Sequence, residues 1–122
     1  MKKTARLVIV QYDAGSNSFT VDPNPVVLLP GITQVFFVIQ TINCGESPPG
    51  MFTAIEVLNK PAFKFLAVDG FARIFKGSID NDLSEGDKEI NLAYRIHIEY
   101  KAAGQLASVD PSIVLLPPTG GP

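Results

Sequence analysis

Apolar residues in this chain occur in short stretches with polar residues between them, and the commonest spacing is the two-residue repeat of β-strands. The clearest example covers positions 90–100, where large apolar residues at even positions alternate with Ala93, Arg95, His97 and Glu99. No window holds apolar residues at helical spacing with capping signals, so we expect little helix. Strands are expected over 6–12, 19–29, 33–42, 51–58, 62–68, 71–79, 90–100 and 106–116.

Prolines interrupt two of these strands, at Pro23 and Pro25 and again at Pro111. A proline has no N–H to give to a central strand, so we expect 19–29 to lie at a sheet edge or to cross between sheets. By contrast, 35–39 (Val-Phe-Phe-Val-Ile) is apolar at every position. Such a run is typical of a strand that is covered on both faces.

The chain contains one short repeat. The segment VDPNPVVLLP at 21–30 recurs, one residue shorter, as VDPSIVLLP at 109–117. Because the flanking sequences differ, we interpret the repeat as chemical convergence between two proline-bent edge strands rather than as a duplication.

Together these features resemble the immunoglobulin-like and cupredoxin-like Greek-key sandwiches. They include a proline-broken early strand, a strongly apolar strand, a tyrosine-rich penultimate strand and a last strand entered through Asp110-Pro111. The resemblance implies an all-β, single-domain Greek-key β-sandwich of about 7–9 strands, in which the first and last strands run side by side. The antibody-type Cys…Trp…Cys pattern is missing, because the chain has no Trp and a single Cys.

Length and composition fit one small domain. The 122 residues are 46% hydrophobic and 18% charged, which is enough apolar material for a packed core. We expect a sandwich domain over 1–116 and a flexible, Pro/Gly-rich tail over 117–122. Ten Lys and Arg against 12 Asp and Glu give a formal charge of -2, so there is no basic footprint for nucleic acid.

The same sequence points to a cytoplasmic protein. The apolar stretch after the basic start is only Leu7-Val8-Ile9-Val10, shorter than the ~7–15 residues of a secretory signal. No apolar run approaches the ~20 residues of a membrane span. The lone Cys44 agrees with a reducing compartment.

Copper and imidazole chemistry are both disfavoured. A blue-copper site needs two His, one Cys and usually a Met, whereas this chain has only His97 and Cys44 with two Met. Strand alternation places His97 on one face with Arg95 and Glu99, opposite the tyrosines. We therefore expect His97 to be a cross-strand partner of a charged residue rather than a general base.

Cys44 lies in the loop 43–50 (NCGESPPG), next to the acidic Glu46. A reactive cysteine needs a positive neighbourhood that lowers its pKa. We expect Cys44 to be a half-buried loop residue with no catalytic part.

The acidic loop 80–89 (DNDLSEGDKE) is the best metal candidate. Calcium takes six to eight oxygen ligands, and Asp80, Asp82 and Asp87 are carboxylates that an irregular calcium site would use. The spacing of an EF-hand loop is not met. When positions are counted from Asp80, Gly86 falls one place later than the glycine of an EF-hand, and position twelve is Asn91 instead of Glu.

These observations favour a non-catalytic module that works by contact with protein. The mean hydropathy of +0.21 is high for one small sandwich, and surplus apolar strand faces are usually covered by a partner. We expect a homodimer or a hetero-complex through a sheet face or the proline-bent edges, with no cofactor, nucleic acid or membrane. The alternative is a ligand-binding module with a loop-end site for calcium or a small polar molecule. A third hypothesis is an enzyme in which the carboxylates of Asp69, Asp80 and Asp110 are brought together from distant loops.

Overall fold

The computed structural model describes residues 3–46, 50–58, 63–68, 73–100, 104–109 and 111–118. These residues contain strands and no helix, in agreement with the all-β prediction. The strands are β1 (Lys3–Asp13), β2 (Ser18–Asp22), β3 (Val26–Leu28), β4 (Gly31–Ile42), β5 (Met51–Val57), β6 (Leu66–Ala67), β7 (Ile74–Asn81), β8 (Ile90–Tyr100), β9 (Gly104–Val109) and β10 (Ser112–Leu115).

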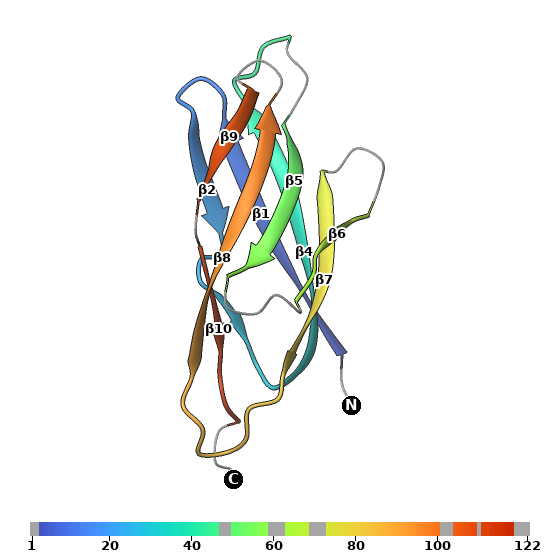
Figure 1. Ribbon diagram of the computed structural model, residues 1–122, viewed down its shortest axis with the longest axis vertical. Coiled ribbons are helices and arrows are strands. Elements are labelled where there is room, and N and C mark those ends of the chain that lie inside the picture. The colour runs from blue at the N-terminus through green and yellow to red at the C-terminus, as the bar shows by residue number, and fades with distance from the viewer. Residues whose placement is uncertain are drawn as a thin grey trace.

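The described strands form two packed, mixed sheets, so the expected β-sandwich is confirmed (Figure 1). One sheet has the order β2-β1-β4-β7-β6, and the other has the order β3-β10-β8-β5, with β9 also paired to β8. The strands run roughly along the long axis, and β1 begins at the end of the sandwich where β10 finishes (Figure 1). The strand number exceeds our expectation because 19–29 and 106–116 are each divided in two near their prolines.

The core lies between the sheets and follows the predicted alternation. In β8 the even positions from Leu92 to Tyr100 are buried, and the odd positions are only partly covered. Aromatic rings fill the centre, where Phe37 packs edge-on against Phe65 with ring centroids 5.1 Å apart. Such pairs stabilise a core by more than their buried area alone.

The proline-rich segment 23–25 carries the chain from one sheet to the other. β2, before it, is an edge strand of the first sheet, and β3, after it, is an edge strand of the second. Pro23 and Pro25 therefore lie where no ladder needs their missing N–H groups. Both parts of the prediction for this segment are confirmed.

The two copies of the short repeat lie side by side. β3 and β10 pair in parallel, with Val26 opposite Ile113 and Leu28 opposite Leu115. The same register results when the two repeat sequences are aligned from their last residues, Pro30 and Pro117. The expectation that the first and last strands run side by side is wrong, because β1 pairs with β2 and β4, whereas β10 pairs with β3 and β8.

Asn81 connects the two sheets at the end of β7. Its side chain is buried, with 2% exposed. Nδ2 donates to the carbonyl oxygens of Leu28 at 3.0 Å and Leu116 at 2.8 Å, and Oδ1 accepts from the Leu83 N–H at 3.2 Å. This buried amide holds the ends of β3 and β10 against β7. β7 therefore extends two residues beyond the predicted end at Ile79.

The expected strand over 62–68 is largely wrong. Within 63–68 only Leu66–Ala67 forms a strand, and Lys64 makes an isolated bridge to Glu56 of β5. The segment crosses from β5 to β7 and turns Phe65 into the core instead of continuing one ladder. Its apolar residues thus fill the open side between the sheets. Ala62 and the start of the expected strand 71–79 lie outside the described residues.

The end of the chain is described as far as Pro118. Pro117 and Pro118 are half-buried and not in a strand. The rest of the expected tail, 119–122, lies outside the described residues.

Candidate functional site

The apolar run 35–39 of β4 is covered on one face only, so the prediction of two covered faces is wrong for this chain alone. Val35, Phe37 and Ile39 point into the core and are at most 7% exposed, whereas Phe36 and Val38 are partly exposed on the outer face. The described chain has two sheet layers, and the outer side of β4 faces away from the opposite sheet.

Neighbouring strands extend this exposed apolar surface. Across β4, Phe36 lies beside Leu7 of β1 and Lys76 of β7, and Lys76 in turn pairs with Leu66 of β6. Residues paired in this way share one face of a sheet. They therefore form a continuous row across four strands.

A second row runs beside the first. Val38 lies beside Ile9 of β1 and Ile74 of β7, and the N–H of Val68 donates to the Ile74 carbonyl at 2.9 Å. We call the surface made by the two rows the β4 face. Its members are Leu7, Ile9, Phe36, Val38, Leu66, Val68, Ile74 and Lys76.

The β4 face is accessible. Leu7 is 54% exposed, Leu66 is 71% exposed and Val68 is 52% exposed. Apolar side chains scattered singly over a surface are ordinary, but a contiguous set on one face is typical of an interaction site.

The rows next to the β4 face are polar but carry little charge. On one side Gln34 lies between Ala5 and Ser78, and on the other side Gln40 lies beside Gln11, which pairs with Thr20. An apolar centre with a polar rim is the usual composition of a protein–protein interface.

The outer face of the opposite sheet has different chemistry. His97 of β8 lies there, and its Nε2 is 2.7 Å from Oε1 of Glu56 on β5. Arg95 pairs with Glu56 in the β5–β8 ladder, and Glu99 is on the same side of β8. This confirms the expectation that His97 is a cross-strand partner on a charged face.

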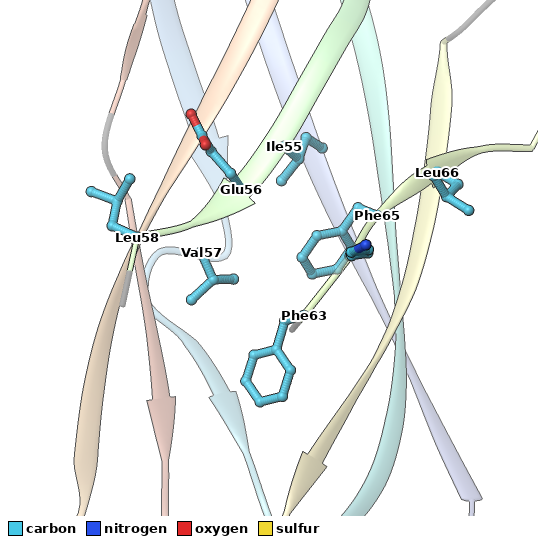
Figure 2. A pocket seen from close by; sticks show the side chains of 8 residues that line it. Ile55, Glu56, Val57, Leu58, Phe63, Phe65 and Leu66 are labelled. Atoms are coloured by element: carbon cyan, nitrogen blue, oxygen red, sulfur yellow. The ribbon is translucent and has the colours of Figure 1, made fainter. Parts of the chain in front are cut away.

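A cavity of about 340 Å³ opens between β5 and the segment 63–66 (Figure 2). In Figure 2 the ring of Phe65 lies below Ile55 and beside Val57, and the ring of Phe63 lies below Phe65. The side chain of Glu56 points away from both rings. Of the residues that line the cavity, Glu56 and Lys64 carry charge, and their backbones are joined by an isolated bridge. These lining residues include no Ser, Cys or His nucleophile–base pair.

The acidic loop does not gather its carboxylates. Asp80 belongs to β7, not to the loop, and is exposed beside Ile32, while Asp82 is exposed after the strand. Oδ2 of Asp87 accepts from the N–H of Ser84 at 2.6 Å, which closes a local turn. Within the part of the chain that the structure describes, no three His, Cys, Asp or Glu residues are placed to hold a metal ion. The calcium alternative stays a prediction for a binding experiment.

The remaining sequence candidates gain little from the structure. Cys44 is a free, half-buried cysteine whose carbonyl accepts from the Tyr100 hydroxyl at 3.4 Å. Asp69 and Asp110 of the enzyme hypothesis lie outside the described residues. No helix in the described ranges is long and apolar enough to cross a membrane.

No protein-family model matches this chain, and no curated protein is significantly similar to it. The functional conclusion therefore depends on the chemistry of the two outer faces.

Proposed function

We propose that this chain is a non-catalytic β-sandwich module that works by contact with another protein surface through the β4 face. One observation carries the proposal: the most apolar run of the sequence, 35–39, has two of its five side chains, Phe36 and Val38, on an outer face that the described chain leaves open. Each 100 Å² of apolar surface that a partner removes from water contributes about 2.5 kcal/mol before the costs of association.

The contrast between the two outer faces supports the choice of site. On the opposite face, His97 Nε2 lies 2.7 Å from Oε1 of Glu56, and such polar and acidic side chains in contact are the ordinary chemistry of a solvated sheet surface. Charged residues are depleted at the centre of interfaces, whereas aromatic residues such as Phe36 are enriched.

The proline-bent edges fit the proposed contact less well. β3 has three residues and β2 has five, and prolines lie between them. Short edge strands flanked by prolines are a common protection against strand addition. The face of the sheet therefore remains the better site.

The resemblance to immunoglobulin-like or cupredoxin-like sandwiches belongs to the same proposal. The parallel pairing of β3 with the last strand, β10, supports it. A cytoplasmic location is likewise proposed, with the free thiol of Cys44 in its support.

Thiol labelling tests whether the β4 face is covered in its native setting. In a Cys44→Ser background, Leu7→Cys places a thiol on the β4 face, and Thr53→Cys places a matched thiol at an exposed position of β5. We expect maleimide to label Leu7→Cys several-fold more slowly in an extract of the source cells than in dilute purified protein, with no change for Thr53→Cys. Equal slowing of both thiols, or of neither, contradicts the proposal.

A further inference from the structure

We propose that the surface that covers the β4 face is a second copy of this chain, so that the protein is a face-to-face homodimer. This inference rests on the proposed function, because it names the partner of the same site. Three features of the face support it: its area, its charge and its position in the sheet.

The area of the sheet suits a stable dimer. β1 and β4 pair continuously from Lys3 with Ile32 to Asp13 with Ile42, which is roughly 35 Å at ~3.3 Å per residue. Neighbouring strands are ~4.8 Å apart, and β2, β7 and β6 are shorter, with five, eight and two residues. The outer surface of the sheet is therefore on the order of 600 Å², at the lower end of the area that each partner buries in a specific interface.

The charge of the face suits a copy of itself better than a strongly charged partner. Lys76 is the one charged member named for the β4 face, and the second row of that face ends at Asp22, which pairs with Ile9. Asp80, which pairs with Ile32, lies on the same side of the sheet. The face therefore has no cluster of charges of one sign that would attract a highly acidic or basic partner. In a homodimer, by contrast, each Lys76 has carboxylates on the facing copy.

The position of β4 suits two-fold symmetry. β4 is the middle strand of its five-stranded sheet. A two-fold axis beside β4 therefore places this sheet face to face with the same sheet of the second copy, with nearly complete overlap. Phe36 and Val38 of both copies then meet at the centre, and the Gln34 and Gln40 rows form the rim. In such an isologous interface each residue contributes twice.

The experiment is molar mass by light scattering on the purified full chain over a concentration series from about 1 μM to 1 mM. We expect a mass near twice 13.1 kDa that falls toward the single-chain value on dilution. Leu7→Glu, at a position 54% exposed in one copy, introduces two buried charges per dimer. We expect it to raise the dissociation constant at least tenfold.

Two further variants complete the design. Val38→Glu repeats the test from β4, and Thr53→Glu on the opposite sheet is the control that leaves the mass unchanged. Circular dichroism and thermal unfolding establish that each variant is folded. If Val38→Glu fails to fold, the exposed Leu7→Glu alone decides the result.

The outcomes separate this inference from the proposed function. A single-chain mass at every concentration, together with slow labelling of Leu7→Cys in the extract, overturns the homodimer and retains a contact with another protein. A dimer that neither glutamate on the β4 face weakens also overturns the inference, because a different surface then forms the interface. A single-chain mass with unchanged labelling in the extract overturns both.

Discussion

The ring of Phe65 occupies the space that a side chain at position 77 would need. A Cβ built on Gly77 meets the Phe65 ring and lies 2.6 Å from the Lys64 carbonyl oxygen, a distance at which an atom must move. Gly77 is paired with Val35 in the centre of the sheet, and the absence of its side chain lets the segment 63–66 pack against β7.

Gly77→Ala is therefore expected to lower the free energy of unfolding by about 1–3 kcal/mol, the usual cost of overpacking a core. Denaturant unfolding measures this change. Ser78→Ala, at the next position of β7 and exposed, is the matched control and should change stability by less than about 0.5 kcal/mol. Equal stabilities for the two variants would show that Phe65 does not pack on Gly77.

Asn81→Ala is expected to destabilise the fold by about 2–3 kcal/mol, because it removes two hydrogen bonds donated from a buried position. Asn91→Ala, at an exposed position of β8, is the control of the same residue type. Amide hydrogen exchange should also speed up at Leu116, whose N–H donates to the Leu28 carbonyl that Asn81 also binds. Unchanged exchange at Leu116 contradicts this account of Asn81.

Two buried tyrosines should respond in opposite ways to loss of their hydroxyl groups. The Tyr94 hydroxyl is fully buried and has no hydrogen-bond partner among the described residues, so Tyr94→Phe should leave stability unchanged or raise it by up to about 1 kcal/mol. The Tyr12 hydroxyl donates to Oδ1 of Asn17 at 3.0 Å, so Tyr12→Phe should cost about 0.5–1.5 kcal/mol. Thermal unfolding of both variants gives the comparison, and a larger loss for Tyr94→Phe would refute it.

Alkaline pH should destabilise the protein through Tyr94. Burial raises the pKa of Tyr94 far above its ordinary value, whereas the unfolded chain releases this proton near pH ~10. The folded state therefore holds more protons above pH ~10, and the free energy of unfolding falls as the pH rises. Denaturant unfolding at several values between pH 8 and 11.5 should show a shallower decline for Tyr94→Phe than for the wild type. Identical slopes would contradict the assignment.

Much of the fold follows from local chemistry in the sequence. Strand alternation placed His97 on a charged face, where it contacts Glu56, and the missing N–H groups of Pro23 and Pro25 located a crossing between sheet edges. Both of these inferences depend on a short-range rule that the tertiary structure does not override. The interpretation of the repeat as two edge strands holds for β3 only, because β10 lies between β3 and β8.

Other features depend on contacts between distant segments. The apolar run at 35–39 does not show whether the outer face of Phe36 is covered by this chain or by another one. Asn81 looks like a loop residue in the sequence, because nothing local reveals that the carbonyls of Leu28 and Leu116 meet at its amide. The crossing segment 63–66 has the apolar content of a strand, although Phe65 fills a gap beside Gly77.

The most direct test of the central claim locates the interface on the β4 face. A spin label on Gln40→Cys, in a Cys44→Ser background, stands at the rim of that face, since Gln40 is exposed on the outer side of β4. The labelled chain is mixed with ¹⁵N-labelled, spin-free chain, and line broadening is measured on the ¹⁵N chain. The homodimer predicts broadening of amides in β1, β4 and β7. Broadening confined to β5 and β8, or its absence at about 1 mM, contradicts the claim.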